Sequence, residues 1–212
     1  MSPAGAVVSV NVGRPRQIAA RGGRAVMSAI GKTPVEGRVR VEGVNLAGDE
    51  QADRRVHGGP DKAVYAYASE DTEWWAGELG RDDLGPGAFG ENLTLHGVDV
   101  TGALVGERWR VGDVELEVAQ PRLPCFKLGL RFEDPGMLKR FVVAGRPGAY
   151  LRILREGSLA AGDAVEVLER PAHDVTVALV SAAIALDDDL LEHAASAPAL
   201  PPELARWMLE RA

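Results

Sequence analysis

The single cysteine of the chain, Cys125, lies in the segment QPRLPCFKLGLR. Pro121 and Pro124 fix the backbone φ angle at two points before it, so we expect this loop to be stiff. Arg122 and Lys127 lie close in sequence, and their positive charge favours the thiolate over the thiol. A thiolate binds soft metals or attacks electrophiles. The segment therefore predicts a working Cys125, and the alternative is a buried cysteine that serves as a small hydrophobic residue.

A second cluster, DRRVHGGPDKAVYAY, contains a histidine, two glycines and several cations. His57 precedes Gly58 and Gly59, whose backbone N–H groups a ligand can approach closely. Lys62 adds positive charge, so the loop suits a phosphate or another anion. The alternative is a solvated turn that contains a histidine by chance. A zinc site fits poorly, because the histidines lack the spacing of zinc ligands; they are His57, His96, His173 and His193.

A third cluster, GAFGENLTL, is rich in turn residues. Asn92 offers both hydrogen-bond donors and acceptors, and Glu91 can accept a hydrogen bond from the N–H of a heterocycle. The alternative is a plain turn before a strand. The chain has no phosphate-binding Walker loop, no nucleophile elbow and no zincin helix, so it lacks the signatures of those enzyme classes.

Strand patterns dominate the first 170 residues. WRVGDVELEV and LAAGDAVEVLE both carry Gly-Asp before a strict alternation of apolar and charged residues, which is typical of strands with one buried face. KAVYAYA, LTL and AYLRILRE are further predicted strands. A helix is expected to follow Ser69 as its cap and to end at Gly80, and PGMLKRFV predicts a short helix. The chain also has 25 Gly and 13 Pro, so we predict a mainly β protein whose strands form a barrel.

The pattern changes after Pro171, where three short helices are predicted. Thr176 is expected to cap the first, and Asp187 or Asp188 the second. Pro201 and Pro202 precede the third, with three apolar residues on one side, namely Leu204, Trp207 and Met208. Three short helices are too few to form a strong core alone, so we expect them to dock on the barrel or on a second subunit. The predicted domains are a barrel over residues 1–170 and a helical segment over 171–212.

The charge and composition exclude several partners. The net charge is −7 and the pI is near 5.2, so a general attraction to nucleic acid or to an anionic membrane is not expected. A lone cysteine rules out an intrachain disulfide and fits a reducing compartment. The amino-terminal sequence lacks the pattern of a secretory signal, and no apolar run is long enough for a membrane helix. The sequence therefore predicts a cytoplasmic protein.

Taken in order, these stretches resemble the MOSC-domain family, proteins similar to the carboxy-terminal domain of molybdenum cofactor sulfurase. The matching stretches are GDEQADRRVHGGPDKAVYAY, FGENLT, VGDVELEV, QPRLPCFKL, GAYLRIL and EGSLAAGDAVEV, roughly residues 35–170. The chain is most similar to the stand-alone bacterial, YiiM-like subgroup, whose members also carry a carboxy-terminal three-helix segment.

The resemblance implies a MOSC-type β-barrel and a pterin-based molybdenum cofactor, molybdopterin, whose metal takes the family's cysteine as a ligand. That cysteine matches Cys125, which would thus be both metal ligand and catalytic residue. The cofactor carries a phosphate, for which Arg122, Lys127, Lys62 and the turn His57–Gly58–Gly59 are sensible anchors. Glu91 and Asn92 are expected to contact the edge of the pterin.

The implied activity is the reduction of N-hydroxylated compounds such as N-hydroxylaminopurines. A separate redox protein must then supply electrons, because the chain has neither a ferredoxin-like set of cysteines nor a dinucleotide-binding GxGxxG after a strand. The expected partners are thus a small N-hydroxylated substrate and an electron-donor protein, with a homodimer left open. Two alternatives are a non-catalytic carrier of the cofactor or its sulfur, and a metal-free cysteine enzyme with His57 as its base.

Overall fold

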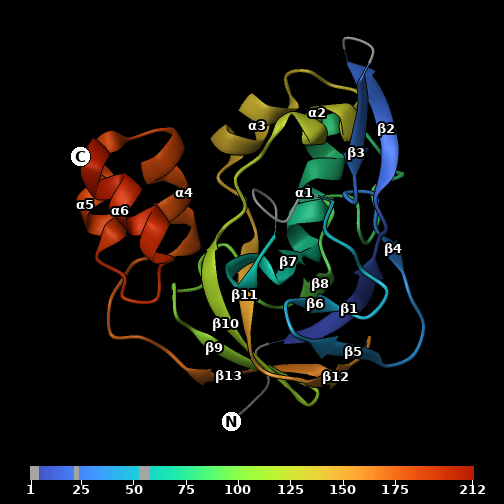
Figure 1. Ribbon diagram of the computed structural model, residues 1–212, viewed down its shortest axis with the longest axis horizontal. Coiled ribbons are helices and arrows are strands. Elements are labelled where there is room, and N and C mark those ends of the chain that lie inside the picture. Colours follow the sequence, from blue (N-terminus) through green and yellow to red (C-terminus); the bar gives the residue numbers. More distant parts are fainter. Residues whose placement is uncertain (1–4, 22–23, 53–57) are drawn as a thin grey trace.

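The computed structural model describes residues 5–21, 24–52 and 58–212, and within them seven strands close into a barrel (Figure 1). The barrel order is β13–β9–β10–β11–β7–β8–β1, and β1 pairs back onto β13. The strand bounds are β1 Gly5–Val12, β7 Val64–Ala68, β8 Leu93–His96, β9 Arg108–Val111, β10 Val114–Pro121, β11 Ala149–Arg155 and β13 Ala164–Glu169. The predicted mainly β barrel is confirmed.

The strand β10 shows why the alternating sequence folds in this way. Val114, Leu116 and Val118 are fully buried in the barrel core, and the glutamates between them are partly exposed. The turn before β10 uses Gly112, whose φ of 57° lies in the left-handed region that glycine adopts at little cost. The Gly-Asp turn predicted from the sequence is therefore confirmed as the two-residue connection of the β9–β10 hairpin.

The neighbouring strands β7 and β8 are parallel, unlike the other pairs of the barrel. Parallel neighbours need a crossover connection, and the helix α1, Ser69–Leu79, provides it. Gly80 ends this helix with a φ of 60°, as predicted. The prediction that Ser69 caps the helix is wrong: Ala68 occupies the cap position, and the Ser69 hydroxyl donates to Glu70.

Two further helices, α2 (Phe126–Phe132) and α3 (Met137–Ala144), join α1 at one end of the barrel (Figure 1). Between these helices and the barrel lies a second core of aromatic residues, which includes Tyr65, Tyr67, Trp75, Phe89 and Phe141. A predicted helix over PGMLKRFV corresponds to α3 and is confirmed. Leu128 and Phe132 anchor α2 in this core, where the Phe132 ring packs on Phe89, so the loop before α2 has a rigid support.

Smaller strands surround the barrel. They are β2 (Arg16–Arg21) and β3 (Arg24–Ser28), a projecting hairpin; β4 (Thr33–Pro34), which pairs with β1; and β5 (Val39–Glu42), β6 (Asn45–Leu46) and β12 (Gly157–Leu159), a separate three-stranded sheet. A single-turn helix, η1 (Pro60–Lys62), precedes β7.

The carboxy-terminal segment packs beside the barrel through its own apolar core (Figure 1). It contains α4 (Val177–Ala185), η2 (Asp188–Leu190), α5 (Leu191–Ala195) and α6 (Pro202–Arg211). Thr176 caps α4 by accepting a hydrogen bond from the Leu179 N–H at 3.0 Å, as predicted. Asp187 likewise caps η2.

The core of this segment includes Val105, from the connection between β8 and β9, so the segment docks beside the barrel of its own chain. Met208 is fully buried in that core, as predicted for the third helix. Trp207 is 40% exposed instead, with Arg211 over its ring, because it lies on the outer side of α6. Among the described residues, every helix is too short or too polar to span a bilayer.

Candidate functional site

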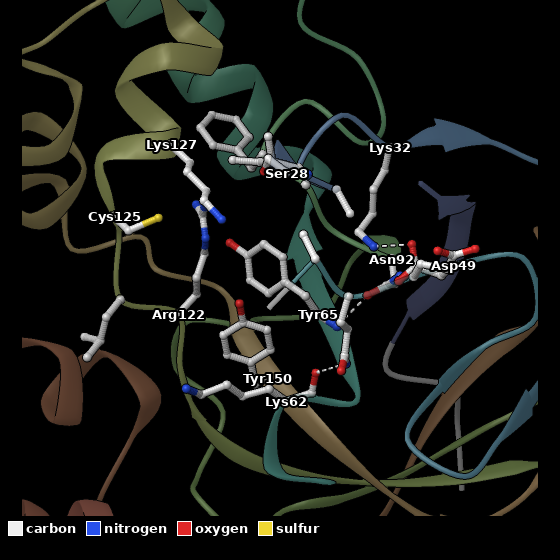
Figure 2. A pocket seen from close by; sticks show the side chains of 18 residues that line it. Ser28, Lys32, Asp49, Lys62, Tyr65, Asn92, Arg122, Cys125, Lys127 and Tyr150 are labelled. Atoms are coloured by element: carbon white, nitrogen blue, oxygen red, sulfur yellow. Dashed lines mark hydrogen bonds and ion pairs between the residues drawn. The ribbon is translucent and has the colours of Figure 1, made fainter. Parts of the chain in front are cut away.

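A pocket opens at the loop before α2 and the start of that helix, against β7 and β11 of the barrel (Figure 2). Six separate stretches of sequence line it: residues 28–32, the loop at 49–52, residues 62–65, the turn at 89–92 before β8, residues 122–127 and Tyr150 of β11. The lining residues that bear chemistry are Ser28, Lys32, Asp49, Gln51, Lys62, Tyr65, Asn92, Arg122, Cys125, Lys127 and Tyr150. The pocket therefore brings together all three of the clusters that the sequence singled out.

Cys125 lies immediately before α2, with an extended backbone at φ −122° and ψ 170°. Its carbonyl accepts the Leu128 N–H at 2.9 Å, which fixes the first turn of the helix. The side chain is partly exposed, and Figure 2 shows the sulfur directed into the pocket, on the side of Arg122 and Lys127. The cysteine is thus accessible to a ligand in the pocket and is not a core residue.

Arg122 is buried, with 6% of its surface exposed, although it carries a permanent charge. Its guanidinium lies 5.4 Å from the ring centre of Tyr65 and 5.3 Å from that of Phe141. Among the described residues, its Nη1 nitrogen has no hydrogen-bond partner. Buried donors are almost always paired in folded proteins, so this nitrogen is available to an acceptor that enters the pocket.

The hydroxyl groups near Arg122 belong to Tyr65 and Tyr150. Burial raises the pKa of both phenols, although the charge of Arg122 acts in the opposite direction. Both residues thus keep their protons at neutral pH. The Tyr65 hydroxyl donates to the carbonyl of Pro147 at 2.9 Å, which holds its ring beside the guanidinium.

On the opposite wall of the pocket, Lys32 pairs with Asp49 (Figure 2). Burial lowers the pKa of Lys32, and the charge of Asp49 opposes that shift. Asp49 also accepts from the Gly13 N–H at 2.7 Å and from Asn92 Nδ2 at 3.1 Å. Sequence reasoning missed this pair, because Lys32 and Asp49 lie in stretches without a motif and become neighbours only in the fold.

Asn92 lines the pocket, but its amide also supports the barrel. Its Oδ1 accepts the Tyr65 N–H at 3.1 Å, and its Nδ2 donates to the carbonyl of Asn11 at 3.2 Å. Such bonds explain why this position needs both a donor and an acceptor. The predicted contact of Asn92 with a pterin stays a prediction.

Glu91 is fully buried and does not line the pocket. Its carboxylate accepts from the Gly87 N–H at 2.6 Å, from the Phe89 N–H at 3.1 Å and from the Thr94 hydroxyl at 2.8 Å. Burial raises the pKa of this carboxyl against those hydrogen bonds. Glu91 thus shapes the turn that carries Asn92, and its oxygens are occupied within that turn.

The glycine turn contributes less than the sequence suggested within the described residues. Gly58 and Gly59 do not line the pocket, and the Gly59 N–H donates to Gln51 Oε1 at 3.4 Å. Lys62, at the end of η1, does line it, and burial lowers its pKa while Asp61 opposes the shift. His57 lies outside the described residues.

The donor set of the pocket fits an anionic group that brings most of its own metal ligands. Among the residues that the structure describes, no cluster of three or more His, Cys, Asp or Glu side chains could hold a metal ion alone. One thiol is present instead, with Arg122, Lys127 and Lys62 around the same space. A metal bound mainly by an anionic organic cofactor, with the thiol as one further ligand, agrees with this arrangement.

The sequence profile of the MOSC domain matches residues 53–166 of the chain, just over half of its length. The chain belongs to the MOSC-domain family. This MOSC protein is 34% identical to protein YiiM of Escherichia coli over 190 residues. The aligned region covers 87% of this chain and 84% of YiiM. The crystal structure of YiiM from Geobacillus stearothermophilus superposes with a TM-score of 0.79 at 31% identity, over 98% of both chains.

A fungal relative carries a functional name. A protein of Gibberella moniliformis called "Reductase" is 38% identical to this MOSC protein over 170 residues, which are 79% of this chain but 30% of the fungal protein. Most of the fungal protein therefore lies outside the region that aligns with this chain. That name belongs to the fungal protein alone, and it states no substrate.

Proposed function

We propose that this MOSC protein is a molybdenum-cofactor-dependent reductase of N-hydroxylated compounds, with Cys125 as the protein ligand to molybdenum. The observation that carries the proposal is that the only thiol of the chain shares a pocket with the buried Arg122, whose Nη1 has no acceptor within the described part of the chain. Thiolates are preferred ligands of soft metals, and a guanidinium is a preferred partner of phosphate. Membership of the MOSC family and the fungal relative named as a reductase support the same assignment.

The cationic side chains of the pocket have a common role in this proposal. Arg122, Lys127 and Lys62 would bind the phosphate and other anionic groups of the cofactor. Lys32 adds a fourth cation on the opposite wall, where Asp49 restrains it. These groups come from separate loops and helices of the folded chain, so the cofactor would not have to assemble them, which would reduce the ordering cost of binding.

When bound, the cofactor supplies a metal centre that exchanges electron pairs with the substrate. The overall reaction converts R–NH–OH, two electrons and two protons into R–NH2 and water; the N–O bond breaks and the nitrogen is reduced. The chain has one cysteine and so cannot hold an iron–sulfur cluster with its own thiols. We therefore also propose a separate electron-donor protein, and a small substrate that enters the open side of the pocket.

The proposal is tested by turnover of 6-N-hydroxylaminopurine with chemically reduced methyl viologen as the donor. Protein expressed with cofactor biosynthesis intact should form the amine, and Cys125→Ser should reduce the rate by at least about a hundredfold, the scale of losing a group that acts at the reacting centre. Cofactor binding without any turnover would contradict the reductase and favour a carrier of the cofactor or its sulfur. Turnover by metal-free protein would favour a metal-free cysteine enzyme.

A further inference from the structure

Arg152 connects three segments that are far apart in the sequence. It lies in β11, and its side chain is only 17% exposed. Its Nε pairs with Asp61 in η1, and its Nη1 donates to Glu117 of β10 at 2.8 Å. The same nitrogen donates to the carbonyl of Ala199, between α5 and α6, at 2.7 Å. One side chain therefore joins the turn that carries Lys62, the barrel and the carboxy-terminal segment.

The register of the barrel explains this position. Arg152 pairs directly with Glu117 across β10 and β11, so the cross-strand neighbours have opposite charges. Tyr150 is two residues earlier on β11 and so projects from the same face of the strand. Since Tyr150 lines the pocket, Arg152 lies on the continuation of the pocket wall towards the carboxy-terminal segment.

The turn η1 depends on contacts from outside itself. It is three residues long, with one internal backbone bond from the Lys62 N–H to the carbonyl of Gly59 at 3.1 Å. Two further supports among the described residues come from Gln120 Nε2, which donates to the Asp61 carbonyl, and from Gln51 Nε2, which donates to the Lys62 carbonyl, each at 3.3 Å. Arg152 adds a charged support through Asp61. Charge-assisted hydrogen bonds are about twice as strong as neutral ones.

We infer that Arg152 is a positioning residue of the pocket, through which the carboxy-terminal helical segment supports the turn that carries Lys62. This inference rests on the proposed function in one respect, namely that the pocket binds an anionic cofactor that Lys62 contacts. It assigns a role to the carboxy-terminal segment: the Ala199 carbonyl orients the guanidinium, and the guanidinium holds Asp61. A lysine in place of Arg152 could not bridge three acceptors with one planar group.

Hydrogen exchange of the cofactor-free protein tests the structural part. Arg152→Met and Asp61→Asn should both raise the exchange rate of the Lys62 amide by about tenfold, the scale of one hydrogen bond to a charged group. Only Arg152→Met should also raise the exchange rate of the Leu200 amide, because Asp61→Asn leaves the hydrogen bond from Arg152 to the Ala199 carbonyl in place. Arg155→Met is the matched control, since Arg155 lies on the same strand, 54% exposed, in a surface pair with Glu115.

Cofactor retention tests the functional part. Arg152→Met and Asp61→Asn should lower the affinity for the molybdenum cofactor by about tenfold, the scale of one hydrogen bond to a charged group, and Arg152→Lys should restore part of it. Unchanged exchange at Lys62 in both variants would overturn the inference, as would faster exchange spread equally over β10. If Arg152→Met does not fold, Asp61→Asn decides alone. Failure of wild type to bind the cofactor contradicts the proposed function, while the exchange result still decides the role of Arg152.

Discussion

Asp49 joins Lys32 to Asn92 in the wall of the pocket, with one carboxylate oxygen on the ammonium and the other on the amide. The side chains of Lys32 and Asp49 are 9% and 2% exposed, so both charges are largely removed from water. A buried pair of this kind is sensitive to the loss of one partner, because the remaining charge stays desolvated.

The first prediction concerns the energy of this pair. Lys32→Met should lower the free energy of unfolding by about 3–5 kcal/mol, since it leaves the Asp49 carboxylate without its cation. Lys32→Met combined with Asp49→Asn should be less damaging than the sum of the two single changes. A double-mutant cycle by urea denaturation measures this coupling. Additive effects within error would contradict a direct ion pair.

The second prediction concerns pH. The pKa of Lys32 is lowered in the folded state by burial, so the unfolded chain binds more protons between that lowered value and the ordinary lysine value of 10.5. Stability attributable to Lys32 therefore rises as pH increases through this window. Wild type should gain stability relative to Lys32→Met as the pH approaches 10.5. Parallel pH profiles of the two proteins would show that burial does not control Lys32.

The third prediction separates stability from cofactor binding at Arg122. Arg122→Met removes a buried cation whose Nη1 lacks a partner among the described residues, so the cofactor-free protein should be as stable as wild type or more stable. Cofactor affinity should fall by about tenfold or more, because a charged hydrogen bond to the cofactor is lost. Thermal unfolding and cofactor retention give the two readouts, with Arg131→Met at the exposed end of α2 as control. A variant that loses stability and keeps the cofactor would contradict this role.

The fourth prediction concerns the carboxy-terminal segment. Met208 is fully buried in its core, and Met208→Ala should cost about 2–5 kcal/mol of unfolding free energy. Trp207→Ala should cost less than about 1 kcal/mol, because the indole is 40% exposed on the outer side of α6. Chemical denaturation of both variants checks the order, and the reverse order would place Trp207 in a buried interface.

Sequence patterns predicted the barrel because local signals agree with the final pairing. The Gly112–Asp113 turn and the alternation over Val114–Val118 specify both the hairpin and its buried face. Thr176 likewise caps the start of α4, and Gly80 ends α1, so each acts on the helix next to it in sequence. The prediction that Ser69 caps α1 was wrong, because the Ser69 hydroxyl donates to the side chain of Glu70 instead. The apolar residues predicted on one side of α6 differ in burial, since Met208 is fully buried and Trp207 is 40% exposed.

The residues that line the pocket were predictable where a motif carried them. Cys125, Arg122, Lys127, Lys62 and Asn92 all line one pocket, as expected of clusters that act together. Lys32, Asp49 and Arg152 were not predicted, because their roles depend on contacts between segments far apart in the chain. Glu91 was expected to face a ligand, but its carboxylate closes its own turn.

The molybdenum content of purified wild type and Cys125→Ser tests the central claim most directly. Both proteins should be expressed with cofactor biosynthesis intact and analysed by elemental mass spectrometry. Because each chain has one such pocket with one cysteine, wild type should contain close to one molybdenum atom per chain. Cys125→Ser should lose most of this molybdenum while its fold stays unchanged. Wild type without molybdenum, or Cys125→Ser with the full wild-type content, would contradict Cys125 as the molybdenum ligand.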